Sequence, residues 1–156
     1  MNDNVDNSLP LVLVVDDNQQ NLELILAYLE EVDCRTDSAT DGYAALEIIK
    51  KRLPDLVLLD VMMPKISGFE VCRKIKRDPQ TADIPVIMIT ALNELGDIER
   101  AIQSGTDDFL SKPVNKWELV TRVRTMLKLK HLTDKLERTL AYLSEVEKSS
   151  QTAHPD

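Results

Sequence analysis

The sequence has few aromatic residues, cysteines and histidines, and each shortage excludes a class of protein or site. Aromatic residues make up 4% of the chain and hydrophobic residues 43%, so the core must be aliphatic, and it is large enough to exclude general disorder. Cys34 and Cys72 lie far apart and form no CxxC pair, which indicates reduced, half-buried thiols rather than a disulfide framework. Because His131 and His154 lack cysteine or acidic partners at ligand spacing, no zinc site is expected.

Long apolar runs and the features of a secretory leader are also missing. No stretch of about 18 consecutive apolar residues occurs, so we expect no membrane-spanning helix. Residues 1–10 are polar and acidic and lack the basic and apolar regions of a signal peptide. These two absences predict a cytoplasmic protein.

The net charge of −8 is unevenly distributed along the chain. Residues 1–111 carry 10 basic and 21 acidic side chains, whereas residues 112–138 carry 8 basic and 3 acidic ones. The acidic part argues against nucleic acid as a partner, and nothing indicates a membrane partner. The basic stretch is either a patch for an acidic partner or, more simply, a solvated helix face.

Short apolar runs alternate with amphipathic segments, a pattern typical of α/β proteins with a parallel sheet. The runs at residues 11–15, 56–59 and 84–89 are apolar throughout, as in strands buried on both faces, while residues 33–38 and 109–110 form weaker strands. Asn18 is a candidate N-cap and Gly105 a candidate C-cap of intervening helices. Five strands and five helices in strict alternation predict a doubly wound, flavodoxin-like sheet of order 2-1-3-4-5.

The last predicted helix, from about Asn115, is longer than a compact domain needs. Apolar residues continue at spacings of three and four in an imperfect heptad stripe: Leu129, Leu132, Leu136, Leu143 and Val146. We therefore expect a disordered N-terminus (1–9), a domain (10–130), a helical extension able to form a coiled coil (131–148) and a disordered tail (149–156). The part beyond about Lys128 is predicted to self-associate as a parallel coil.

Polar side chains occur where the predicted strands end. They are Asp16 and Asp17 after the first strand, Asp60 after the third, Thr90 after the fourth, and Lys112, followed by Pro113, after the fifth. Ligands of open parallel sheets bind beyond these carboxyl ends, so we expect the side chains to share one rim.

Three carboxylates on one rim repel each other and call for a cation. Oxygen ligands favour Mg²⁺ over zinc. With Mg²⁺ and Lys112 offsetting the charge of an incoming phosphoryl group, one carboxylate can attack it, and the Thr90 hydroxyl can bind a phosphoryl oxygen. The rim thus predicts magnesium-dependent phosphoryl transfer to a carboxylate.

Four segments, Val14–Asn18, Leu58–Pro64, Ile89–Ala91 and Asp107–Pro113, closely resemble the motifs of response-regulator receiver domains. The resemblance covers roughly residues 10–130 and holds at all five key positions. It implies a phosphoacceptor signalling domain, not an enzyme, which promotes only its own phosphorylation and dephosphorylation. The implied partner is a sensor histidine kinase or a phosphotransfer protein.

The resemblance also implies the role of each site residue. Asp60 accepts the phosphoryl group, and Mg²⁺ is bound by Asp16, Asp17, Asp60 and the backbone carbonyl of Met62. Thr90 is the switch hydroxyl, Lys112 is the ion-pair donor, and the Lys112–Pro113 peptide is cis. Phe109 resembles the aromatic residue that changes rotamer with Thr90, the alternative being a plain core residue of the strand. The output face would comprise the fourth helix, fifth strand and fifth helix.

Two other functions do not fit these residues. A phosphatase of the haloacid-dehalogenase type needs a second aspartate two residues after the nucleophile, where this chain has Met62. A flavin phosphate would be repelled by Asp16 and Asp17. A constitutive dimerisation or adaptor module acting through the C-terminal helix remains open, with a homodimer formed by that coil or by the output face. The run 122–136 resembles linkers of receivers that precede diguanylate cyclase or cyclic-di-GMP phosphodiesterase domains.

Overall fold

The computed structural model describes residues 8–91 and 95–152. Five parallel strands form one sheet in the order β2-β1-β3-β4-β5, as the sequence predicted. The strands are β1 (Leu11–Val15), β2 (Arg35–Ala39), β3 (Leu56–Asp60), β4 (Val86–Thr90) and β5 (Asp108–Ser111). Every residue of β1, β3 and β4 is buried, which explains why these strands are apolar up to Asp60 and Thr90, the last residues of β3 and β4.

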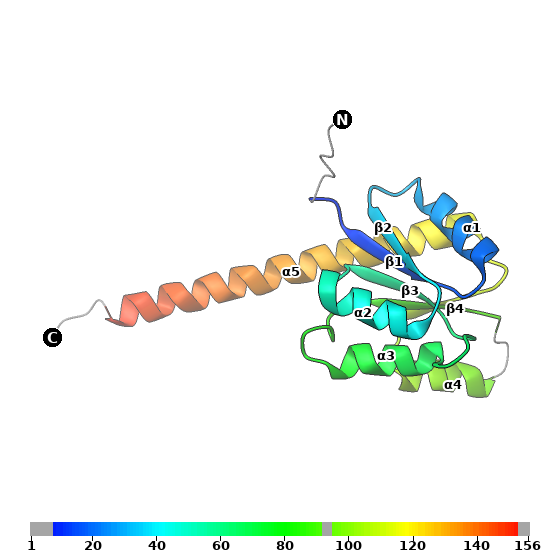
Figure 1. Cartoon of the computed structure of the whole chain (residues 1–156). Coiled ribbons are helices and arrows are strands. Elements are labelled where there is room, and N and C mark those ends of the chain that lie inside the picture. The colour runs from blue at the N-terminus through cyan, green and yellow to red at the C-terminus, as the bar shows by residue number, and fades with distance from the viewer. Residues whose placement is uncertain (1–7, 92–94, 153–156) are drawn as a thin grey trace.

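Helices cover both faces of the sheet (Figure 1). They are α1 (Gln19–Leu29), α2 (Gly42–Arg52), α3 (Gly68–Arg77), α4 (Leu95–Gln103) and α5 (Lys116–Thr152). Side chains of α1 and α5 pack on one face, and those of α2, α3 and α4 pack on the other. The predicted doubly wound fold is therefore confirmed.

Side-chain caps fix where several helices begin. The side chains of Asn18, Asp41 and Ser67 each accept a hydrogen bond from a backbone N–H in the first turn of α1, α2 and α3. Asn115 does the same for α5 by accepting from the backbone N–H of Glu118. After α4, Gly105 has a φ of +91°, the left-handed conformation expected of a C-cap glycine.

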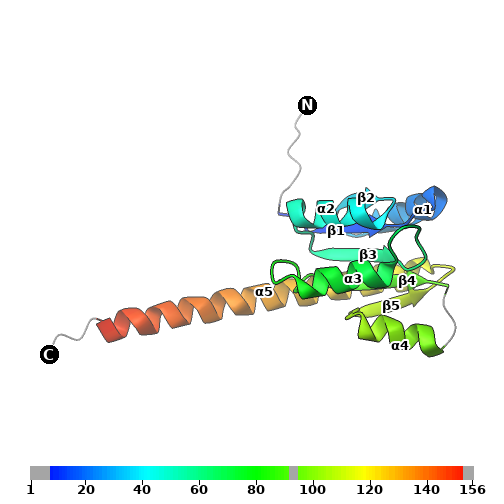
Figure 2. The ribbon, with the colours of Figure 1, turned by 60° about the horizontal axis from the view of Figure 1, so that its bottom comes forward.

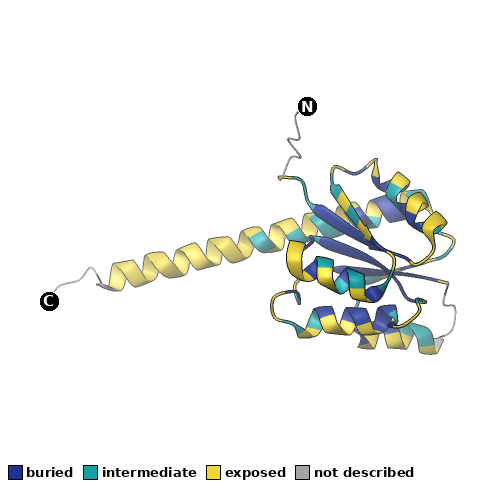
Figure 3. Cartoon of the chain, in the orientation of Figure 1, coloured by how far each residue is buried: buried dark blue, intermediate teal, exposed yellow. Residues whose placement is uncertain are grey.

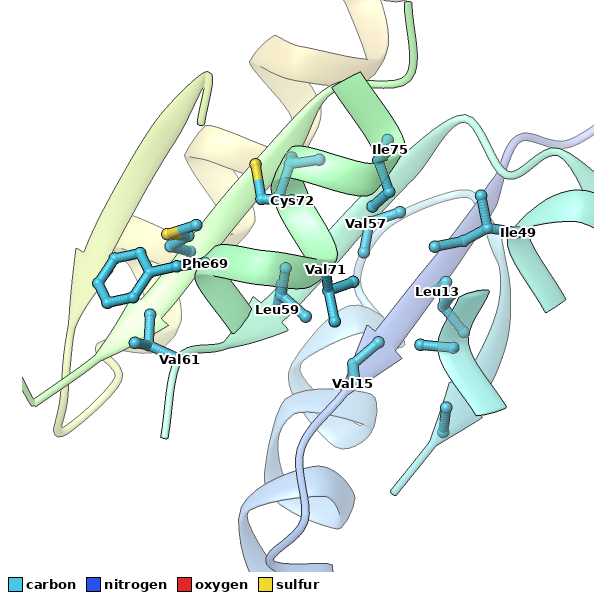
Figure 4. Packing of buried hydrophobic residues seen from close by; sticks show 14 of the residues in the cluster. Leu13, Val15, Ile49, Val57, Leu59, Val61, Phe69, Val71, Cys72 and Ile75 are labelled. Atoms are coloured by element: carbon cyan, nitrogen blue, oxygen red, sulfur yellow. The ribbon is translucent and has the colours of Figure 1, made fainter. Parts of the chain in front are cut away.

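The core consists of two aliphatic clusters, one on each side of the sheet. Figure 4 shows the cluster on the α2 and α3 side, where Leu13 of β1 lies near Ile49 of α2, and Val57 of β3 lies near Ile75 of α3. Alternate residues of the same strands contribute to the cluster under α1 and α5. Both cysteines are free, and burial raises the pKa of each thiol.

Helix α5 leaves the body of the domain and projects into solvent, as Figures 1 and 2 both show. It ends at Thr152, which corrects the predicted start of a disordered tail at residue 149. No glycine or proline occurs between residues 149 and 152, so nothing interrupts the helix there; residues 153–156 lie outside the described part.

Leu9 belongs to the predicted disordered N-terminus, but it contacts the folded domain. Leu9 is held in place because its carbonyl accepts a 3.0 Å hydrogen bond from Arg35 Nε. Residues 1–7 lie outside the described part of the chain. Across residues 8–91 and 95–152, no helix combines the length and apolar character needed to cross a membrane.

Candidate functional site

The polar residues predicted to share a rim lie at the carboxyl ends of four strands. Asp16 follows β1 and Asp60 ends β3, and their exposed fractions are only 1% and 4%. Thr90 ends β4 and is buried, while Lys112 follows β5. Asp17 is exposed to solvent beside them. Because the strands are parallel, their ends converge on one edge of the sheet.

The three aspartates lie close enough to bind one cation. Carboxylate oxygens of Asp16, Asp17 and Asp60 all lie within 4.8 Å of one another. Asp16 is oriented by its Oδ1 atom, which accepts a 2.9 Å hydrogen bond from the backbone N–H of Asn18. A set of carboxylate oxygens, two of them from buried residues, fits a hard divalent cation such as Mg²⁺.

Lys112 supplies the positive charge of the site. Its Nζ atom lies 3.2 Å from Asp60 Oδ1 and 3.5 Å from Asp16 Oδ2. The backbone N–H of Lys112 donates a 2.8 Å hydrogen bond to the carbonyl of Thr90, which ties the segment after β5 to the end of β4. The Lys112–Pro113 peptide is cis, as the resemblance implied.

The electrostatics of the site centre on Asp60. Burial, and then the negative charge of Asp16, raise the pKa of the Asp60 carboxyl from 3.8 to about 6, although Lys112 acts in the opposite direction. The single ammonium group therefore does not compensate the two buried carboxylates. Additional positive charge at this rim would favour the ionised, nucleophilic form of Asp60.

Met62 contributes no side chain to the cluster. Its side chain is 69% exposed in the loop after β3, so only its backbone carbonyl is a candidate ligand. Two backbone hydrogen bonds to the Val61 carbonyl, from Met63 and Gly68, fold this loop back on the end of the strand.

Gly68 is a positioning residue whose role the sequence did not reveal. A Cβ atom at this position would lie 2.3 Å from the Asp60 carbonyl oxygen and 2.8 Å from Val61 Cα. Only glycine allows the start of α3 to approach the nucleophile's backbone this closely. The need for glycine here is not visible in the sequence, because the close approach is between segments that meet in space.

Replacing Gly68 with alanine is expected to lower both stability and phosphorylation. The clash is with backbone and should cost about 1–3 kcal/mol of unfolding free energy, and shifting Asp60 should slow phosphoryl transfer by about tenfold or more. Urea denaturation and initial phosphorylation rates measure the two effects. Gly96→Ala is the matched control, because a Cβ there meets nothing within 4 Å; equal behaviour of the two variants would contradict the positioning role.

Thr90 and Phe109 lie on the same face of neighbouring strands. Met88 pairs with Phe109 and Thr90 with Ser111 in the parallel register, and alternate residues share a face. Phe109 is 37% exposed, so the alternative that it is a plain core residue is wrong.

The comparisons with known proteins agree with this geometry. Residues 12–124 match the family model of the response regulator receiver domain. The chain is 45% identical over 127 residues to the response regulator PleD of Caulobacter vibrioides, covering 81% of this chain and 28% of that protein. It is 39% identical over 120 residues to the DNA-binding dual master transcriptional regulator RpaA of Synechocystis, covering 77% of this chain and 50% of that protein.

Solved structures show the same likeness. The signal receiver domain of a histidine kinase from Syntrophus aciditrophicus superimposes with a TM-score of 0.72 at 33% identity, covering 76% of this chain and 90% of that one. The chain thus spans half or less of the two curated relatives but most of this receiver structure. By its family match, its sheet order and the convergence of its strand-end residues, the chain belongs to the response-regulator receiver domains of two-component signalling.

Proposed function

We propose that Asp60 takes a phosphoryl group from a sensor histidine kinase or a phosphotransfer protein in a magnesium-dependent reaction. The observation that carries this proposal is the pairing of Lys112 Nζ with two buried carboxylates, at 3.2 Å from Asp60 and 3.5 Å from Asp16. A lysine that approaches two acids is poised to bind a phosphoryl oxygen as the group arrives.

The phosphoryl transfer needs no reactant besides the phosphorylated donor histidine and Asp60. An oxygen of the Asp60 carboxylate forms a bond to phosphorus, the bond from phosphorus to the donor histidine nitrogen breaks, and the imidazole leaves. Asp16 and Asp17, with Asp60 and the Met62 carbonyl, would hold Mg²⁺, which supplies charge neutralisation when bound. Lys112 pairs with the phosphoryl oxygens, and no acid at position 62 is available for phosphatase chemistry.

Phosphorylation would then change the face formed by α4, β5 and α5. The Thr90 hydroxyl turns to a phosphoryl oxygen, and Phe109, on the same face of the next strand, moves inward into the space released. A partner or output domain that binds this face would distinguish the two states. One relative is a DNA-binding regulator, so receivers of this kind serve several outputs; for this chain we favour those that precede diguanylate cyclase or cyclic-di-GMP phosphodiesterase domains, on the resemblance of residues 122–136.

Intact-mass spectrometry after incubation with acetyl phosphate and Mg²⁺ tests the proposal. One added phosphoryl group is expected on the wild-type chain and none on Asp60→Asn, whose amide is not a nucleophile. Omitting Mg²⁺ should strongly reduce the wild-type signal. An adduct of equal yield on Asp60→Asn would contradict the assignment of the acceptor.

The aspartyl phosphate is expected to persist. Met62 and Leu92, two residues after Asp60 and Thr90, are apolar and cannot orient an attacking water; Leu92 lies outside the described residues. Met62→Glu, which adds a carboxylate on an exposed position, should speed hydrolysis about tenfold, a change of about 1.4 kcal/mol in the barrier. Decay after removal of the donor measures this, with Met62→Leu as the control, and loss of the wild-type adduct within seconds would count against it.

A constitutive dimerisation or adaptor module acting through the C-terminal helix is the second candidate function. The exposed apolar side chains of α5 favour it. It is compatible with phosphorylation, since the helix leaves the sheet far from the acidic rim (Figure 1). Homodimers through the α4-β5-α5 face or through the coil are both part of this candidate.

A further inference from the structure

The projecting part of α5 carries an uncovered apolar stripe. Its side chains are between 45% and 58% exposed: Leu129, Leu132, Leu136, Leu140, Leu143 and Val146. Figure 3 shows that most of this part of the helix is exposed, and the burial of its residues agrees, since only Lys130 and Asp134 between residues 128 and 150 are partly covered. A helix of this length is marginal in water on its own, and its stability comes from burying an apolar face.

The stripe faces away from the domain that carries it. Within the body, α5 packs on the sheet through Leu119, Val120 and Val123, which are fully buried. With 3.6 residues per turn, the mean direction of the stripe is rotated by roughly 160° from that packing face. The domain's own body therefore cannot cover the stripe, and a partner can approach it without meeting the body.

The side of α5 that carries the apolar stripe continues into the body as the outer face of the helix. Thr121, Arg122 and Thr125 lie on it at helical spacing, beside a hollow of about 520 Å³ that Trp117 and Met126 also line. The stripe alone is about 27 Å long at 1.5 Å per residue, which is short for a two-stranded coil. The outer face of α5 within the body can lengthen this contact only if the two helices run in the same direction, because only then do the two bodies lie beside each other.

The residues on this line suit pairing with an identical helix. Leu129, Leu136 and Leu143 repeat every seven residues, the spacing of a coiled-coil seam. In a parallel pair in register, Lys135 would flank Leu140 of the other copy, and Tyr142 would flank Glu147, so no like charges flank the apolar stripe.

Within the body, the charge on the seam is already compensated. Arg122 lies 2.6 Å from Asp108 and 3.4 Å from Glu118 in its own chain. Two copies of Arg122 can therefore approach each other without leaving an unpaired cation on the seam.

We infer that a second copy of this chain packs in parallel along α5, from the outer face over Thr121 and Thr125 to the end of the stripe at Val146. The second copy is the partner in the homodimer considered above as a second candidate function. Only the use of this dimer in signalling rests on the proposed phosphorylation of Asp60. The pair has two-fold symmetry, with each body on the outside of the two helices.

Light scattering across a concentration series tests the inference on the full chain. The expected mass is twice the 17.7 kDa of one chain. Leu136→Glu with Leu143→Glu should give a monomer, because it places charges on the seam. Ala141→Glu with Ser144→Glu adds the same charge away from the stripe and should remain a dimer. A monomeric wild type, or a dimer that resists the seam substitutions, would overturn the inference, the latter in favour of the α4-β5-α5 face or another surface.

Oxidative cross-linking tests the direction of the helices. Ser150 lies on the seam line seven residues after Leu143, so Ser150→Cys should form a disulfide-linked dimer in a parallel pair, whereas the wild type with its two native cysteines should not. No cross-link would overturn the parallel arrangement. Phosphorylation by acetyl phosphate should be normal in all of these variants, so a failure of dimerisation is distinguishable from a failure of the phosphoacceptor proposal.

Discussion

Replacing Lys112 with alanine is expected to slow phosphorylation by acetyl phosphate about 10²–10³-fold, the usual effect of removing one positioned charge donor from a transition state. The Lys112 ammonium is within 3.5 Å of both Asp16 and Asp60 and is the cation of the described rim. Without it, the pKa of Asp60 should rise further above 6, since Lys112 is the group that lowers it. Initial rates from intact-mass spectra measure the loss.

The matched control for that experiment is Lys116→Ala. Lys116 lies four residues further along the chain and pairs with Glu31, away from the aspartates. Its removal should leave the phosphorylation rate within about twofold, because Lys116 pairs with Glu31 and not with the aspartates of the site. The lost ion pair is exposed and contributes little to stability. A Lys112→Ala rate equal to that of this control would contradict the proposed role of Lys112.

Asp60→Asn is expected to stabilise the magnesium-free protein at pH 7. The folded pKa of about 6 exceeds the unfolded value of 3.8, so the folded chain binds this proton more tightly. The stability that the protonated Asp60 carboxyl contributes to the folded chain is therefore fully present below about pH 4. It is lost as the pH rises to about 6. At 1.36 kcal/mol per pKa unit, the ionised carboxylate costs on the order of 3 kcal/mol above that range, which an uncharged amide avoids.

Urea denaturation at several pH values measures this effect. The stability difference between Asp60→Asn and wild type should be near zero at pH 4 and reach about 1–3 kcal/mol at pH 7. Saturating Mg²⁺ should shrink or reverse the difference, because it stabilises only the chain with the complete acidic cluster. A wild type that is more stable than Asp60→Asn at pH 7 without Mg²⁺ would show that Asp60 is not destabilised by burial.

Most of the fold followed from patterns local to the sequence. The apolar runs of β1, β3 and β4 indicated strands buried on both faces, and parallel connectivity alone brought Asp16, Asp60 and Lys112 to one rim. The helix caps at Asn18 and Gly105 were also visible, because capping depends on residue type and position.

What the sequence could not show depends on distances between segments or on weak local preferences. The need for glycine at position 68 arises from the Asp60 carbonyl, which approaches from another element. An apolar residue in a strand is usually buried, yet Phe109 is partly exposed, and its strand β5 lies at the edge of the sheet. The polar residues 149–152 have little intrinsic preference, so their helical state follows from the helix that precedes them.

Helix α5 would take part in both the response to phosphorylation and dimerisation. The helix is part of the proposed output face, where its Arg122 pairs with Asp108 of β5, and it continues into the apolar stripe. A rearrangement of β5 on phosphorylation would thus reach the seam without passing through any other element.

The most direct measurement of the central claim is the position of the phosphoryl group itself. Borohydride reduces an acyl phosphate to an alcohol, so the phosphorylated chain, once reduced and digested, should yield homoserine in place of aspartate at position 60. Peptides that contain Asp16 and Asp17 should be unchanged. Reduction at either of those residues, or at none, would contradict Asp60 as the phosphoacceptor.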